Sequence, residues 1–131
     1  MPLKQLRSGE SATTDRILSS AYTTETGIAL EKGVMYRMAV VEIEGWQDGH
    51  VPCDAGGHDI WYLRLVKFKR RVPDANWLAL MGSINGEEPF LIGMRTSYTA
   101  TRDGQLVCFA NDAGFAYGNN KGWAKVHVTR V

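Results

Sequence analysis

Residues 105–129 read QLVCFANDAGFAYGNNKGWAKVHVT, and this stretch decides the fold class. In its second half Ala124, Val126 and Val128 alternate with polar residues. An apolar residue at every second position predicts a strand with one buried face. Residues 105–110 are similarly rich in residues that favour strands, whereas glycine and asparagine crowd 111–122. The stretch therefore predicts two strands joined by a loop.

Segments rich in residues that favour strands recur along the rest of the chain. Residues 34–44, VMYRMAVVEIE, are apolar on both alternating faces, which indicates a strand covered on both sides, in a sandwich or at a subunit contact. Further strands are predicted at 60–69 and 77–84, and the latter reaches a turn signal at Asn85-Gly86 before a returning strand at 90–94. Turns or loops are predicted at 45–49, 50–59 and 101–104.

These strands predict an all-β protein, a jelly-roll-like β-sandwich of short antiparallel strands. We expect a single domain over residues 1–131, in which 1–24 form a less certain N-terminal segment. In that segment Thr14 or Asp15 could cap a short turn of helix.

Composition excludes several classes of function. The 131 residues are 44% hydrophobic and carry a net charge of +1, so we expect no attraction to nucleic acid or to an anionic membrane. No run approaches the roughly 20 apolar residues of a membrane span. The first 30 residues lack the apolar region of a signal peptide, which predicts a cytoplasmic protein or export without a recognisable signal. Two cysteines, Cys53 and Cys108, favour free thiols over a disulfide.

The loop 111–122 carries the most unusual chemistry. Asp112, Asn119 and Asn120 place three side-chain oxygens within nine residues. A hard cation such as Ca²⁺ binds six to eight oxygens, so carbonyls and outside ligands would have to complete its shell. Both asparagines can face one ion only if the backbone kinks between them. Asn, Asp and Gly are also ordinary loop residues that satisfy local backbone groups, so the spacing alone leaves a structural role open.

From about Thr26 onward the chain resembles the PA-IL family of bacterial galactose-binding lectins. The resemblance lies in TGIALEKGVMYRMAVVEIEGW, in WLALMGSING followed by FLIG, and in FANDAGFAYGNNKGWAKVHV. Its most specific part is Asn-Asp followed by Tyr-Gly-Asn-Asn and Gly at the same offsets. This resemblance implies a calcium-dependent, non-enzymatic lectin that forms homo-oligomers and binds galactose or a related sugar through two neighbouring hydroxyls.

The resemblance also implies residue roles. Calcium would be bound by side-chain oxygens of Asp112, Asn119 and Asn120 and by main-chain carbonyls of Ala116 and, near the Gly-Trp pair, Gly49. The sugar hydroxyls would contact Asp112 and Asn119, with help from the main chain at Ala113.

One departure concerns sugar specificity. The galactose-specific member uses a His and a Gln that align with Leu65–Lys69, where neither residue is present. His58 could substitute if its loop folds back. Phe115, inside the proposed loop, and Trp61 are candidates for an exposed aromatic platform, whereas Trp46 and Trp123 are predicted in the core or an interface.

Other patterns favour structural roles. Cys53, Asp54, His58 and Asp59 match no common zinc spacing. The basic run Lys67, Lys69, Arg70 and Arg71 is predicted as a solvated strand edge, although it could line an anionic sugar. No nucleophile with a paired base is evident. The alternatives to a lectin are a non-catalytic structural or interaction module and the carbohydrate-targeting subunit of a glycan-processing complex.

Overall fold

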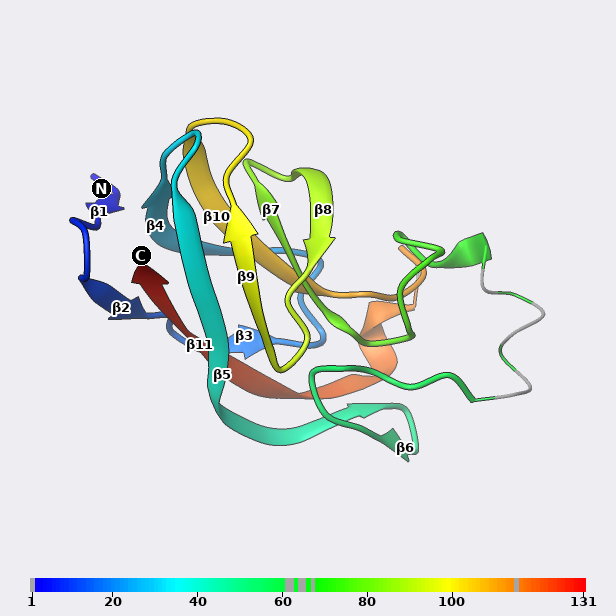
Figure 1. The fold of residues 1–131 in the computed structure, drawn as a ribbon. Helices are drawn as coiled ribbons and strands as arrows, with labels where there is room; N and C mark the ends of the chain where they lie inside the picture. The colour runs from blue at the N-terminus through cyan, green and yellow to red at the C-terminus, as the bar shows by residue number, and fades with distance from the viewer. Residues whose placement is uncertain (1, 61–62, 64–65, 67, 115) are drawn as a thin grey trace.

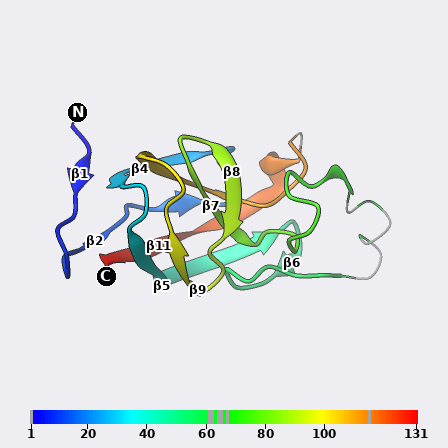
Figure 2. The same cartoon turned by 45° about the horizontal axis from the view of Figure 1, so that its top comes forward.

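In the computed structural model, which describes residues 2–60, 63, 66, 68–114 and 116–131, two β-sheets lie face to face (Figures 1 and 2). The first sheet has the order β1 (Lys4–Gln5), β4 (Thr24–Leu30), β10 (Gly104–Ala110), β7 (Leu80–Ile84) and β8 (Glu87–Leu91). The second has the order β2 (Ser11–Thr13), β11 (Asn120–Arg130), β5 (Met35–Asp48) and β6 (Val51–Pro52), with β3 (Ile17–Leu18) paired to β11 and β9 (Arg95–Thr99) paired to β5. Every pairing is antiparallel except that of β1 with β4. The predicted all-β sandwich is confirmed.

The core lies between the sheets. The alternation of apolar and polar residues in the last strand explains which side chains enter it. Ala124, Val126 and Val128 are fully buried on β11. They belong to one cluster with Tyr36 and Met38 of β5 and with apolar residues of the first sheet, namely Ile28, Leu30, Leu80, Ile84, Leu106 and Cys108. Residues at period two on facing strands thus provide one apolar layer.

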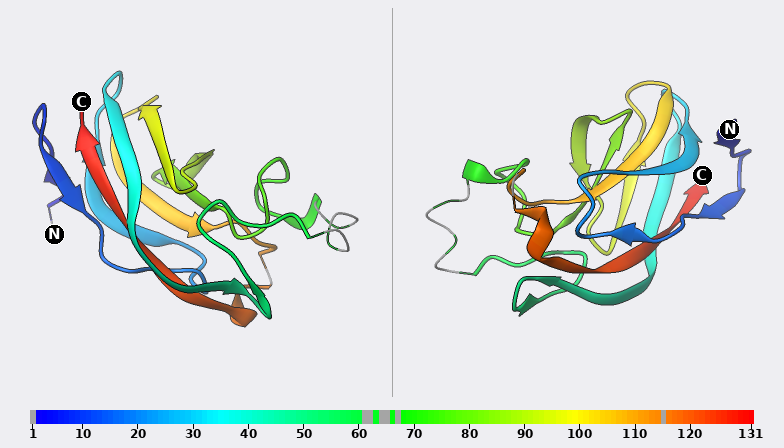
Figure 3. Two further views of the ribbon diagram at one scale, coloured as in Figure 1. Left: turned by 60° about the horizontal axis from the view of Figure 1, so that its bottom comes forward. Right: turned by 180° about the vertical axis from the view of Figure 1, so that it is seen from behind.

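The two ends of the sandwich differ. Both chain termini lie at one end, and the long segments between β6 and β7 and between β10 and β11 lie at the other (Figures 1 and 3). The second of these segments ends in a short 3-10 helix, η2 (Tyr117–Asn119). Within the described ranges, no helix has the length and apolar character that crossing a membrane requires.

Three local predictions were wrong. Residues 45–48 belong to β5 instead of a turn, because Gly45 forms part of an irregular pairing with β11. Of residues 60–69, Leu63, Val66, Phe68 and Lys69 have 3-10 conformation and not the predicted strand, an ambiguity inherent in short apolar runs. No helix follows Thr14, whose hydroxyl instead accepts a hydrogen bond from the Val126 N–H at 3.0 Å, while Ile17–Leu18 form β3.

The hairpin at Asn85-Gly86 was predicted correctly, but its returning strand begins earlier than expected. Both residues have positive φ angles, 57° and 85°, as a tight two-residue turn between antiparallel strands requires. The strand β8 therefore starts at Glu87.

A bulge joins the two longest strands. The register of β5 and β11 shifts between Lys121 and Trp123, where Gly45 and Gly122 have φ angles of 59° and 90°. A Cβ atom on Gly122 would lie 2.3 Å from the carbonyl carbon of Gly45. The two backbones therefore approach more closely than any side chain allows. Beyond the bulge the register places Asn120 opposite Asp48.

Replacing Gly122 by Ala should therefore destabilise the fold. The added methyl meets backbone atoms in a conformation that L-residues rarely adopt, so we expect a loss of about 3 kcal/mol or more in the free energy of unfolding. Denaturant unfolding in EDTA measures it. Gly118→Ala is the matched control, because a Cβ there has no atom within 4 Å. A loss at Gly122 no larger than at Gly118 would contradict the assignment of a tight bulge.

Candidate functional site

A cavity of about 280 Å³ opens at the end of the sandwich away from the termini. It is lined by Asp48, Leu63, Val66, Lys69, Trp77, Asp112, Ala113, Ala116 and Asn119. These residues come from the end of β5, from the segment between β6 and β7, and from the loop that follows β10. Four of the residues singled out in the sequence, Asp112, Ala113, Ala116 and Asn119, therefore meet at one cavity.

Asp112 is the buried acid of this cavity, 2% exposed. Its Oδ1 accepts a hydrogen bond from the Ala113 N–H at 2.7 Å, whereas its buried Oδ2 has no hydrogen-bond partner among the described residues. Burial raises the pKa of Asp112, and the nearby Asn120 amide and Ala113 N–H offset part of that rise. A buried carboxylate oxygen without a partner is costly unless something else satisfies it.

Asn119 and Asn120 occupy different backbone conformations. The 3-10 helix η2 ends at Asn119, and Asn120 is extended with φ −80° and ψ 147°, so the backbone kinks between the two side chains. The buried Asn120 donates from Nδ2 to the Ser19 carbonyl at 3.0 Å, which leaves Oδ1 without a described partner. The loop thus holds two buried, unpartnered side-chain oxygens, one on Asp112 and one on Asn120.

Gly49, whose carbonyl was expected to bind calcium, lies beside this loop. Its N–H donates to the Asn119 carbonyl at 3.1 Å, and a Cβ built on it would lie 3.4 Å from Asn119 Nδ2. Its carbonyl oxygen accepts a hydrogen bond from Gln47 Nε2 at 2.8 Å. The turn after β5 therefore brings a main-chain carbonyl close to the asparagine pair.

The sequence analysis missed Asp48. Asp48 Oδ2 lies 3.0 Å from His58 Nε2, and both side chains are only about a tenth exposed. His58 does not line the cavity itself, but its backbone pairs with that of Trp77, which does. The loop carrying His58 thus folds back towards the site. The position of Asp48 immediately before Gly49 was the only sequence signal for it.

Asn111, next to the predicted ligand Asp112, holds residues 72–76 in place by hydrogen bonds. Its fully buried side chain accepts from the Val72 N–H at 2.9 Å and donates from Nδ2 to the carbonyls of Val72, Ala75 and Asn76 at 2.9–3.1 Å. Four hydrogen bonds from one amide fix residues 72–76 against the end of β10. Trp77, which follows directly, is positioned by them.

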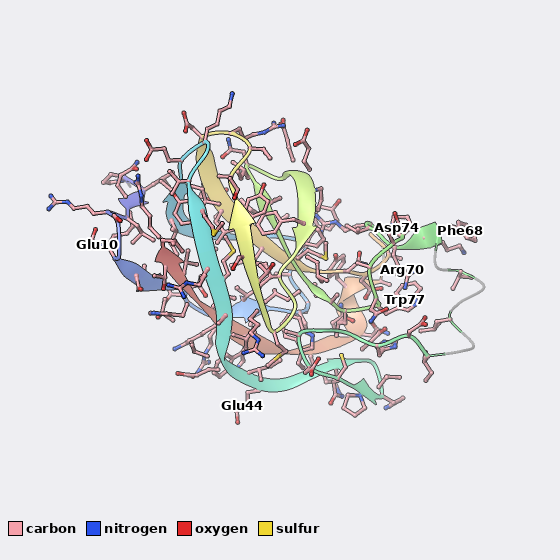
Figure 4. The ribbon with its side chains drawn as sticks, viewed as in Figure 1. Glu10, Glu44, Phe68, Arg70, Asp74 and Trp77 are labelled. Carbon is pink, nitrogen blue, oxygen red and sulfur yellow. The ribbon has the colours of Figure 1, made fainter. Side chains whose placement is uncertain are left out.

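The prediction of a solvated strand edge was wrong for Arg70 and Arg71, the second half of the basic run. Arg70 is 7% exposed, pairs through its backbone with Ala113, and has its guanidinium 5.3 Å from the Trp77 ring (Figure 4). The guanidinium of Arg71 lies 3.7 Å from the ring centroids of both Tyr22 and Phe109. These contacts replace solvent with aromatic faces.

Arg71 also steadies the loop that carries the site. It donates to the hydroxyl of Tyr117 at 2.9 Å, and that hydroxyl donates to the Ala110 carbonyl at 2.5 Å. Its backbone N–H donates to the carbonyl of Asp112 at 3.0 Å. Both ends of the loop are therefore fixed independently of the side-chain oxygens that face the cavity.

The remaining sequence candidates are placed elsewhere. Trp61, Lys67 and Phe115 lie outside the described residues, and Trp46 is buried with Nε1 donating to the Leu78 carbonyl, as predicted for a core residue. The Trp77 Nε1 is buried and has no partner among the residues described. Tyr22 and Phe68 are exposed aromatic side chains.

The cysteine-containing loop does not gather metal ligands. Asp54 Oδ1 accepts a hydrogen bond from the Gly56 N–H, and over the described ranges no three His, Cys, Asp or Glu side chains are grouped as a metal site needs. Cys53 and Cys108 are free thiols, as predicted, and burial is the main cause that raises the pKa of each to about 12.

Comparison with known proteins defines the class of fold. No protein-family model matches the chain, and no curated protein matches its sequence. Solved structures do match, and the likeness shows a shared fold. One of them is the EclA N-terminal domain, described as a PllA-like lectin. It superposes with a TM-score of 0.63 at 19% sequence identity, over 92% of this chain and 95% of that one.

Removing the Asn111 side chain should release the segment that it fastens. We expect Asn111→Ala to lower the free energy of unfolding by about 3 kcal/mol or more, since a fully buried group with four hydrogen bonds is lost. The Val72 amide should exchange its hydrogen faster. Asn76→Ala is the control, because its exposed side chain makes one bond of 3.3 Å, and should cost less than about 1 kcal/mol. Equal effects of the two variants would refute the fastening role.

Proposed function

We propose that this protein is a non-enzymatic lectin that binds calcium and, through it, a sugar with two neighbouring hydroxyls, galactose first. The observation that supports the proposal best is the pair of buried oxygens, Asp112 Oδ2 and Asn120 Oδ1, that have no partner in the described part of the chain. Each such oxygen costs about 1–3 kcal/mol when left unsatisfied. A hard cation satisfies both, and oxygen is the ligand atom that calcium prefers.

The remaining ligands lie within the same loops. Asn119 lines the cavity beside Asp112 and contributes its side-chain oxygen, and Ala116, also on the cavity wall, contributes its carbonyl. Gly49 contributes its carbonyl from the turn after β5. One carbonyl oxygen can accept both the Gln47 hydrogen bond and a cation, because it has two lone pairs.

The sugar is recognised by the same groups. Bound calcium supplies a positive centre for two neighbouring hydroxyl oxygens. Asp112 and Asn119 accept or donate hydrogen bonds to those hydroxyls, and the main chain at Ala113 helps. Leu63, Val66 and Trp77 give the cavity an apolar wall for the C–H face of the ring, while Lys69 contributes a polar group. His58 acts from behind Asp48, and Phe115 stays a candidate contact outside the described residues.

Affinity for one sugar should be weak, because a monosaccharide offers few atoms to a shallow site. We propose that homo-oligomers present several sites to repeated glycans and gain avidity in that way. The alternative is a non-catalytic interaction module. It is favoured by one observation, that Val66 and Lys69 line the cavity in the region where the galactose-specific lectin uses a His and a Gln.

Titration with sugars tests the proposal. Galactose and a small panel of monosaccharides should bind in millimolar calcium and lose binding in excess EDTA, as measured by isothermal titration calorimetry. Asp112→Ala should remove binding as well, since it deletes the buried carboxylate. If calcium raises the unfolding midpoint but no sugar binds, the interaction module replaces the lectin as the preferred function.

Calcium-free stability provides a second test. The folded-state pKa of Asp112 is raised, so ionisation of Asp112 opposes folding. This cost is absent below the carboxyl's ordinary pKa of 3.8 and grows as pH rises through the folded-state pKa. At pH 7 in EDTA, Asp112→Asn should therefore have an unfolding midpoint equal to or above that of the wild type. The gap should close towards pH 4.

The same variant should lose its response to calcium. We expect calcium to raise the wild-type midpoint and to leave that of Asp112→Asn unchanged, as followed by thermal unfolding. Asp15→Asn, an exposed change of the same charge, is the control and should respond like the wild type. An Asp112→Asn protein that calcium still stabilises would exclude Asp112 as a ligand.

A further inference from the structure

A second carboxylate, that of Asp48 at the end of β5, lines the cavity. Asp48 lines the same cavity as Asp112, yet no role for Asp48 was expected from the sequence. Its place is fixed by strand register, because Asp48 is the direct partner of Asn120 in the antiparallel pairing of β5 and β11. Directly opposed residues on such strands have Cβ atoms about 4.5–5.5 Å apart.

The surroundings of Asp48 hold its side chain in place. Its side chain is 11% exposed, and its Oδ2 lies 3.0 Å from His58 Nε2. The backbone of His58 is in turn fixed by two hydrogen bonds with Trp77, of 2.8 and 3.0 Å. An imidazole that orients a carboxylate from behind is a common outer partner of metal ligands.

The two carboxylates act on each other. Burial is the main cause of the raised pKa of Asp112; the negative charge of Asp48 adds to that rise, and the charge of His58 opposes it. Two acids at one cavity repel unless a cation lies between them. Lys69 also lines the cavity, but its side chain is exposed to solvent. The unpartnered buried oxygens of Asp112 and Asn120 show where a cation is needed.

We propose that Asp48 is a second anionic group of the cation site, held in position by His58. The inference rests on the proposed function and deepens it. With two carboxylates, the protein matches the +2 charge of calcium, which loop residues 111–120 alone would only half neutralise. Because affinity for calcium rises with the number of charged ligands, the site should retain its ion at lower calcium concentrations than a one-carboxylate site.

The test compares the calcium affinity of the wild type with that of Asp48→Asn, by competition with a chelating dye. We expect Asp48→Asn to lose tenfold or more in calcium affinity, because it removes one negative charge without changing side-chain shape. Asp15→Asn should stay within about twofold. His58→Ala should lose affinity as well, and His58→Gln, whose side-chain amide can donate to Asp48, should restore part of it.

Thermal unfolding in EDTA separates a role towards the cation from a structural one. Without calcium, Asp48→Asn removes repulsion with Asp112, so its midpoint should equal or exceed that of the wild type. A midpoint several degrees lower would assign Asp48 a structural role and overturn the inference.

The possible failures are distinguishable. If the wild type binds calcium and Asp48→Asn binds it equally well, the inference about Asp48 is wrong while the proposed function stands. If the wild type binds no calcium, both are wrong.

Discussion

The antiparallel pairing of β5 with β11 is the constraint on which the rest of the structure depends. It runs from Tyr36 opposite Arg130 to Asp48 opposite Asn120, and at one end of the sheet it brings together residues that are more than 70 positions apart in sequence. A bulge at Gly45 and Gly122 interrupts it. A second register shift lies between Lys125 and Val126. Because side chains alternate between faces, the bulge at Gly45 and Gly122, which is the nearer to the cavity, affects which residues beyond it face the cavity. The pairing of β5 with β11 lets the core residues be buried, and its register brings Asp48 opposite Asn120.

The site is assembled on a rigid frame whose contacts do not involve the cavity-facing oxygens. Asn111 fixes the segment before Trp77 with four hydrogen bonds, and Arg71 fixes Tyr117 and the backbone of Asp112. The polar atoms of Asp112 and Asn120 are thus left unsatisfied by surroundings that are otherwise well bonded. A frame that is stable without its ligand pre-organises a binding site, so little ordering remains when a ligand binds.

Sequence alone was informative where a local pattern carries the physics. The alternation in residues 123–129 gave the buried face of β11, Asn85-Gly86 gave a hairpin turn, and the Asp112 loop was located by its oxygen-bearing residues. The predictions that failed concern residues whose conformation depends on partners far away in the sequence. Gly45 was predicted in a turn, because its close approach to Gly122 is not visible in the local sequence. Arg70 and Arg71 were predicted as surface charges, because the aromatic rings that cover them come from other parts of the chain. Asp48 could not be found locally, because only the strand register brings it to the cavity.

The residues that line the cavity come from three separate stretches of chain. The proposed cation ligands lie in the turn after β5 and in the loop before β11, whereas Leu63, Val66 and Lys69 belong to the long segment between β6 and β7. The part of that segment nearest to β7, residues 72–76, is held by the side chain of Asn111. Under the proposed function, residues 60–69 of this segment can therefore be exchanged, and the segment made longer or shorter there, while the proposed cation ligands stay the same. Sugar preference would then change through this segment alone, much as antibody loops vary on an invariant framework.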